Sequence, residues 1–260
     1  MNYRLGKLPP VYDSRTLRFG HYLEPHLPPP PPSVDYGANV KKWPMYDNDR
    51  YGDCTCAAAG HMIQCWTAVA GKAKTPTSAS VLKFYEHFVG TPPPPDQGCN
   101  MRDVLTYWRH TGLAKDKIKA FVSLEPKNQT QAQDALYMFG SIYIGVALPD
   151  SVCHGDLLQN PWVVPPQGPI GDAAPDPNNG HCVCAVGYDS RQLYVVTWGE
   201  IKPMSWPFYA AYADEAYAVL STDFIAQNGE TTAGFDLTAL EKDLDQISNI
   251  PSTAVRYTRR

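Results

Sequence analysis

The sequence predicts an α+β protein in which a helical part precedes a sheet part. Apolar residues follow helical spacing over much of the first half, whereas residues 141–221 contain short apolar runs typical of strands. The chain has 260 residues, of which 43% are hydrophobic and 12% aromatic, so it can form a sizeable core. Helices and strands segregated along the chain are typical of α+β folds. We therefore expect a helical lobe and an antiparallel sheet lobe.

Composition excludes several functional classes. The formal net charge of −4 argues against nucleic acid as a partner. No stretch of about 18 uncharged apolar residues is present, so we expect no membrane partner. The N-terminus lacks the apolar core of a signal peptide, which leaves the location unknown and favours the cytoplasm or an assembly. Seven cysteines, an odd number, are not typical of a disulfide scaffold. A homo-oligomer or a larger assembly stays open.

Four helices are predicted in the first half of the chain. The first begins at Cys54, with Asp53 as its N-cap, and ends at Gly71. Within it, Ala58, Met62, Cys65/Trp66 and Val69 follow helical spacing. The other three helices are predicted over 78–89, 101–111 and 129–139.

Strands are predicted in the second half. Residues 141–148 alternate apolar positions with a period of two, and Pro149 ends the run. Further strands are expected over 181–188, 192–197 and 215–221, followed by a helix over 235–247. These patterns divide the chain into an extended, proline-rich segment (1–33), a main domain (34–225, with a helical lobe at about 48–140 and a sheet lobe at about 141–221), and a C-terminal helix and tail (226–260).

Cys54 is the strongest candidate for chemistry. It lies in the first turn of a predicted helix, where free backbone N–H groups and the helix dipole stabilise a thiolate. A nucleophilic thiol also needs a base from elsewhere in the chain. His181 is the natural candidate because it begins a strand directly after a loop rich in Pro, Asn and Gly.

Several motifs in one order resemble the papain-like cysteine peptidases. They are VDYGANVKKWPMYDNDRYGDCTCAAAGHMI around Cys54, DQGCNMRDVLTYWRHTGL, FGSIYIGVALPDS, and NNGHCVCAVGYDSRQLYVVTWGE around His181. His181 follows Cys54 by 127 residues and Thr197 follows it by 143, close to the family's spacing of about 130–150. The similarity covers roughly residues 34–221. It implies a papain-like two-lobed fold with a long central helix, over the main domain 34–225.

The resemblance also implies an activity, the hydrolysis of peptide bonds in a peptide or protein substrate. Cys54 would attack the amide carbonyl, and His181 would protonate the leaving amine. Asn48, six residues before Cys54, stands where the family has the glutamine of its oxyanion hole, and its alternative role is a turn residue. Asn100 corresponds to the family's Gly-Cys-Asn segment and Trp198 to its Asn-Ser-Trp-Gly segment, so both are predicted to bind substrate. No cofactor and no metal are implied.

The chain departs from the family at three places. Thr197 stands near the position of the asparagine that orients the histidine, and a Thr hydroxyl can accept one hydrogen bond from the ring; Asp189 or Glu200 are the alternative acceptors. Thr55 replaces the tryptophan that normally follows the nucleophile. Met101 and Arg102 replace a glycine pair that binds substrate backbone, so we expect an altered groove.

Three alternative functions stay open. A metal site built from the clustered cysteines and His181 is disfavoured, because thiols two residues apart on a helix point in different directions and neither pair has zinc spacing. Another thiol chemistry on the same fold, such as acyl transfer or amidase activity, is the second. The third is a catalytically impaired domain that serves as a binding or structural module.

The family's usual propeptide is helical, whereas residues 1–33 are proline-rich, so a further hypothesis is that this segment covers the groove in another way.

Overall fold

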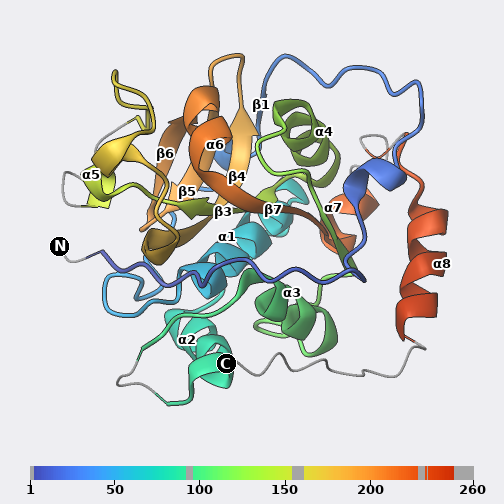
Figure 1. The fold of residues 1–260 in the computed structure, drawn as a ribbon. Helices are drawn as coiled ribbons and strands as arrows, with labels where there is room; N and C mark the ends of the chain where they lie inside the picture. The colour runs from blue at the N-terminus through green and yellow to red at the C-terminus, as the bar shows by residue number, and fades with distance from the viewer. Residues whose placement is uncertain (1–2, 92–95, 154–160, 228–231, 233, 249–260) are drawn as a thin grey trace.

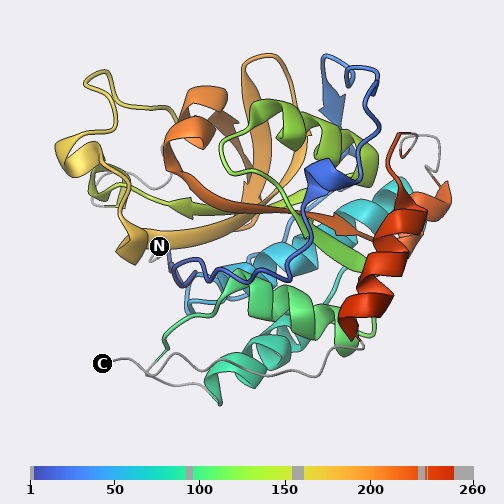
Figure 2. The same ribbon diagram turned by 45° about the vertical axis from the view of Figure 1, so that its right-hand side comes forward.

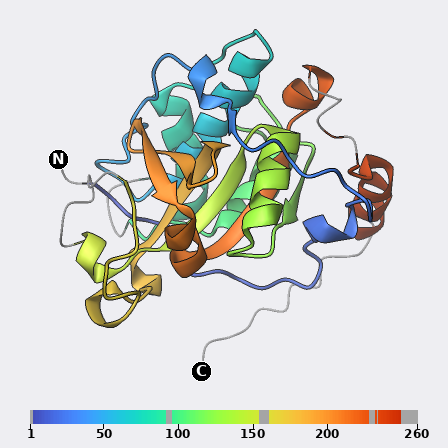
Figure 3. The ribbon, with the colours of Figure 1, turned by 90° about the horizontal axis from the view of Figure 1, so that it is seen from above.

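The sheet is the centre of the fold (Figures 1 and 3). In the computed structural model, which describes residues 3–91, 96–153, 161–227, 232 and 234–248, its strand order is β2-β7-β3-β4-β5-β6, and β1 also pairs with β4. All of these pairings are antiparallel. The strands are β1 (Val34–Asp35), β2 (Ala120–Ser123), β3 (Ile142–Ala147), β4 (Gly180–Tyr188), β5 (Gln192–Thr197), β6 (Glu200–Ser205) and β7 (Ala213–Leu220).

Helices pack on both sides of this sheet. They are α1 (Cys54–Val69), α2 (Ser78–Val89), α3 (Met101–His110), α4 (Gln129–Phe139), α5 (Asp150–Cys153), α6 (Trp206–Tyr212), α7 (Thr222–Gln227) and α8 (Leu237–Ser248). Single 3-10 turns occur at Phe19–His21, Gly37–Asn39, Gly171–Ala173 and Pro177–Asn179. Among the described helices, none combines the length and the apolar character needed to cross a membrane.

Helix α1 is the central helix of the molecule. Residues 54–67 are all buried, as expected for a helix that is apolar on every side. Strand β4 explains how two cores form, because its side chains alternate between the two faces of the sheet. Cys182 and Cys184 belong to the core around α1, α2 and α3, whereas Val183 and Ala185 belong to the core that includes α4 and α6.

The predicted fold class is confirmed, and the predicted helices and strands are observed within one or two residues of their expected ends. Strands β1, β2 and β6 and helices α5, α6 and α7 were not predicted. Strand β6 carries Lys202 and Pro203 at the edge of the described sheet, so it lacks the apolar pattern of an inner strand. The helical lobe was expected to extend to about residue 140, whereas β2 pairs with β7 and α4 packs on the sheet. The predicted C-terminal tail lies outside the described residues beyond position 248.

The N-terminal segment crosses the front of the molecule. Residues 3–13, here called the strap, run between the sheet and helices α2 and α3 (Figures 1 and 2). The strap contacts both sides, because Lys7 N–H donates to the Gly180 carbonyl of β4 and Leu8 N–H donates to the Cys99 carbonyl just before α3. This segment was expected to be extended, and most of it has no regular structure. Its path leads directly to the candidate site.

Candidate active site

Helix α1 begins at the candidate nucleophile. The Asp53 carbonyl accepts hydrogen bonds from the N–H groups of Cys56 (2.8 Å) and Ala57 (2.9 Å), which starts the helix at Cys54. Asp53 is the N-cap, as expected, but its side chain makes no capping hydrogen bond. The Cys54 thiol is hydrogen-bonded by the backbone of Cys182, the residue after His181. The helix start therefore lies against the start of β4.

His181 is held by one of its two ring nitrogens. Its Nε2 lies 2.7 Å from Thr197 Oγ1, across the neighbouring strand β5. Its Nδ1 is buried and has no hydrogen-bond partner among the described residues. Asp189, the first alternative acceptor, instead caps the β4–β5 turn by accepting from the N–H groups of Arg191 and Gln192, and Glu200 is exposed. Thr197 is thus the residue that hydrogen-bonds the ring, and within the described residues no hydrogen bond joins the ring to Cys54.

Trp198 covers the imidazole. The rings of Trp198 and His181 are stacked, with centroids 4.4 Å apart and planes at 19°. The indole is held there by the two-residue hairpin turn between β5 and β6, in which Trp198 (φ 48) and Gly199 (φ 80) both have positive φ. Such turns favour glycine and asparagine, so a tryptophan here is unusual. Trp198 is 4% exposed and shields one face of His181 from water.

Asn48 sits in a tight turn and also points at the strap. Its side-chain Nδ2 donates to the Tyr51 carbonyl (3.1 Å) and to the Arg4 carbonyl (3.4 Å). The indole N–H of Trp198 donates to the same Arg4 oxygen (3.4 Å). Asn48 is therefore a turn residue, as its alternative role predicted, and its amide also donates to a carbonyl of the strap, while its role in an oxyanion hole stays a prediction.

Asn100 is the N-cap of α3, because its side chain accepts from the Arg102 N–H (2.9 Å). Its Nδ2 donates to the Pro9 carbonyl of the strap (3.1 Å). Arg102 in turn pairs with Asp13 at the other end of the strap. Asn100 and Arg102, the second of which replaces one of the family's glycines, therefore anchor the strap. Thr55, at the position of the family's tryptophan, is buried beside Cys99, with 2.8 Å between Oγ1 and Sγ.

The two candidate catalytic groups are neutral in this structure. Burial raises the pKa of the Cys54 thiol to about 12, against a smaller opposite effect of the Cys182 backbone hydrogen bond. Burial also lowers the pKa of His181 to about 3, and the positive charges of Lys202 and Lys7 lower it further. A thiolate–imidazolium pair is disfavoured while both groups are dry.

The strap packs closely against the start of β4 and against the segment before α3. Gly6 and Lys7 both donate from their backbone N–H groups to the Gly180 carbonyl (3.2 and 3.1 Å), and Cys99 N–H donates to the Gly6 carbonyl (2.9 Å). A methyl group on Gly180 would overlap the Lys7 carbonyl oxygen. Similarly, a methyl group on Gly98 would overlap Gly6. These glycines make room for the strap, and sequence reasoning missed their role.

No metal site accompanies these residues: the described ranges contain no group of three or more His, Cys, Asp and Glu side chains placed to bind an ion. All seven cysteines are free.

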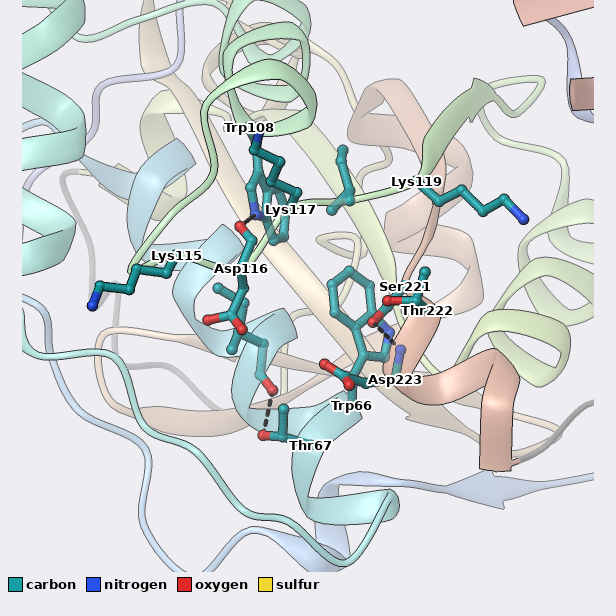
Figure 4. Close-up of a pocket in the computed structure, with 12 residues that line it drawn as sticks. Trp66, Thr67, Trp108, Lys115, Asp116, Lys117, Lys119, Ser221, Thr222 and Asp223 are labelled. Atoms are coloured by element: carbon teal, nitrogen blue, oxygen red, sulfur yellow. Dashed lines mark hydrogen bonds between the residues drawn. The ribbon is translucent and has the colours of Figure 1, made fainter.

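A separate cavity of about 600 Å³ lies at the far end of α1 (Figure 4). It is lined by Trp66, Thr67, Trp108, residues 115–119 and residues 221–223. Trp66 is about 18 Å along the helix from Cys54, so this cavity is distinct from the candidate site.

Comparison with known proteins supports the fold assignment. No protein-family model and no characterised protein sequence matches the chain. Among solved structures, xylellain, a cysteine protease from Xylella fastidiosa, matches with a TM-score of 0.64 and 16% identity over 85% of this chain and 97% of that one. Procathepsin L 3 of Tenebrio molitor matches with 0.54 and 12% over 84% and 76%. A Carica candamarcensis cysteine protease matches with 0.52 and 13% over 74% and 99%. The chain therefore has the papain-like fold.

Proposed function

We propose that this protein is a cysteine peptidase in a latent form, with Cys54 and His181 as its catalytic pair. The observation that best supports the proposal is that only one of the two ring nitrogens of His181 is hydrogen-bonded. Thr197 is hydrogen-bonded to Nε2, while Nδ1 is buried without a hydrogen-bond partner among the described residues, and the backbone of Cys182, the next residue of β4, acts on the Cys54 thiol. A base that is held by one nitrogen and free at the other is what a thiol nucleophile requires.

The first chemical step is acyl transfer to sulfur. After proton transfer from Cys54 to His181 Nδ1, the thiolate sulfur adds to the carbonyl carbon of the substrate, and the C=O π electrons move to oxygen. The Cys54 backbone N–H and the Asn48 amide would donate to this oxyanion. When the oxyanion collapses, the C–N bond breaks, and the imidazolium gives its proton to the leaving amine. The product is a thioester on Cys54.

The second step is hydrolysis. His181 takes a proton from water, and the hydroxide oxygen adds to the thioester carbonyl. Collapse breaks the C–S bond and releases the carboxylic acid, while the proton returns to the sulfur. Thr197 and Trp198 contact the imidazole rather than the substrate carbonyl, so they act as positioning residues, and Trp198 keeps water off one ring face.

Latency follows from the strap. The Arg4 carbonyl already occupies the amide of Asn48, and Asn100 donates to Pro9. Cys54 is 1% exposed and His181 is fully buried. A substrate cannot reach the pair until the strap leaves, and exposure to water would then allow both groups to ionise.

The experiment uses the full-length chain with the strap loosened by Gly180→Ala. A mixture of peptides is incubated with Gly180→Ala, Gly180→Ala/Cys54→Ala and Gly180→Ala/His181→Ala, and new termini are read by mass spectrometry. We expect cleavage by the first variant alone. Cleavage that survives loss of Cys54 would overturn the proposal.

The alternative is a catalytically impaired papain-like domain that serves as a binding module, and the two neutral, buried groups favour it. The same experiment separates the two functions. If Gly180→Ala exposes Cys54 to alkylation and yet no peptide is cleaved, the domain is a binding module. Addition of an amine nucleophile to the reaction tests acyl transfer, since an amide product in place of the acid would show it.

A further inference from the structure

A buried cation lies beside the candidate catalytic pair. The side chain of Lys7, from the strap, is 1% exposed, and its Nζ lies 2.8 Å from Asp214 Oδ2 and 3.4 Å from Glu215 Oε1. It also donates to the Leu8 carbonyl (3.2 Å). The surrounding residues, here called the Lys7 pocket, are Met101, Gly145, Asp214, Glu215 and Tyr217.

The pocket is shaped for a long, linear side chain. A methyl group on Gly145 would overlap Cε of Lys7 and would come within 2.8 Å of both Glu215 Cγ and Met101 Sδ. Gly145 does not have positive φ, so its backbone does not require glycine. The missing side chain at this position in the middle of β3 therefore makes the space that the Lys7 stem fills.

The end of the pocket is acidic. Glu215 is 5% exposed and its Oε2 accepts from the Tyr217 hydroxyl (2.9 Å), which fixes the carboxylate. Its Oε1 makes no hydrogen bond within the described residues and faces the Lys7 ammonium. Asp214 lies at the more exposed mouth, with a side chain 21% exposed. A buried carboxylate needs a cationic partner, so this pocket discriminates strongly against apolar and acidic side chains.

The pocket adjoins the reacting atoms. The Lys7 charge acts on the pKa of both Cys54 and His181, and the Lys7 backbone N–H donates to Gly180, the residue before His181. When the strap leaves, Lys7 leaves with it, and Glu215 and Asp214 remain without their cation. A peptide that lies in the place of the strap would present one of its own side chains to this pocket.

We propose that the Lys7 pocket selects the substrate, which must place a lysine or arginine side chain against Glu215 and Asp214. The proposal rests on the peptidase function proposed above, and Lys7 is then a stand-in for the substrate side chain. Glu215 is the specificity residue. The absence of a side chain at Gly145 leaves the space that the substrate side chain would occupy.

The main experiment measures selectivity in the full-length Gly180→Ala variant. Each set contains four fluorogenic peptides that are identical except for one residue, which is Lys, Arg, Met or Glu. Further sets vary the residue at each of the other positions of the peptide. We expect kcat/KM to be at least about tenfold higher for Lys and Arg than for Met at one position. Adding Glu215→Gln should reduce this ratio to about threefold or less, and adding Gly145→Ala, which keeps the charges, should also reduce it. Equal cleavage of all four peptides, dependent on Cys54, would overturn the specificity and leave the peptidase function standing.

A second experiment needs no catalysis. Lys7→Ala removes a propylammonium group, so n-propylammonium chloride should raise the melting temperature of full-length Lys7→Ala more than n-propanol does. Wild type, whose pocket is filled, and Lys7→Ala/Glu215→Gln, whose pocket has lost its buried charge, are the controls and should respond equally to both compounds. If no peptide is cleaved but the amine rescues Lys7→Ala alone, the peptidase function fails and the cation preference holds. If the amine affects all three proteins equally, the cation preference is overturned.

Discussion

At the scale of single residues, the pair of Cys54 and His181 is kept neutral by the same burial that protects it. Both side chains are dry, and Lys7 and Lys202 add positive charge near the imidazole. An activated thiolate needs the opposite environment, one in which a charged imidazole is stabilised. Under the proposed function, the latent and the active state would therefore differ in the hydration of these two side chains and in the position of Lys7.

The different burial of the thiols predicts the order in which they react with an alkylating agent. Burial raises the pKa of Cys54 to about 12, whereas half-buried Cys153 has a pKa raised to about 11. At pH 8 the Cys153 thiolate is about ten times more abundant and is also easier to reach. We expect iodoacetamide to modify Cys153 before Cys54 in wild type, as followed by peptide mass over time. Rapid modification of Cys54 in wild type below pH 7 would contradict the latent state.

The buried histidine also predicts a pH dependence of stability. Its pKa falls from 6.5 to about 3 on folding, so the unfolded chain binds the proton first. The stability that neutral His181 provides is present above pH 6.5 and is lost as the pH falls toward 3. Between these values the wild type should lose about 1.4 kcal/mol per pH unit more than His181→Gln. Urea unfolding at several pH values measures both slopes, and parallel slopes would show that His181 is not buried in the neutral form.

At the scale of elements, the strap contacts β4 at Gly180, whose backbone conformation is accessible to any residue. Gly180 has φ −64, yet a methyl group there would overlap Lys7. We expect Gly180→Ala to weaken the strap by about 1–3 kcal/mol, which raises the population of the open form about 5- to 150-fold. The alkylation rate of Cys54 should rise by that factor.

Two controls make this result specific. The alkylation rate of Cys153, which lies on α5 and not on β4 or the strap, should not change. Gly20→Ala serves as the matched variant, since the nearest atom to its methyl group would be Gln131 Nε2 at 3.5 Å, an ordinary contact. An unchanged Cys54 rate in Gly180→Ala would mean that the strap does not limit access.

The elements also explain how far the sequence could predict the site. Cys54 and His181 were found because each begins a periodic element and because ordered motifs surround them. The Lys7 pocket was missed because Lys7 lies in a proline-rich stretch without periodicity, and Glu215 lies 208 positions away in an apolar strand. Only the pairing of β3 with β7 brings Glu215 opposite Gly145. The local signal in the sequence was the pair of carboxylates, Asp214 and Glu215, directly before an apolar run.

At the scale of the whole molecule, the strap joins the two cores. Gly6 and Lys7 donate to β4 in the sheet, while Leu8 and Cys99 pair next to α3. At its far end Asp13 pairs with Arg102. The strap is thus bound along most of its length to elements from both sides, so we expect the closed form to be strongly favoured over the open form in the wild type.

The strength with which the strap is bound can be tested at the buried ion pair of Lys7 and Glu215. Removing one partner of a buried pair costs about 3–5 kcal/mol, because the other charge stays buried alone. Lys7→Met should therefore lower the melting temperature by about 6–20 °C. Adding Glu215→Gln removes the stranded charge, so Lys7→Met/Glu215→Gln should recover a large part of this loss, and the double-mutant cycle should show coupling of about 1–3 kcal/mol. Calorimetry of the full-length chain measures all four proteins. If the strap detached on its own, Lys7→Met would release it, Glu215 would meet water, and the melting temperature would barely move. Such a result would place the latent state only slightly below the open one in free energy.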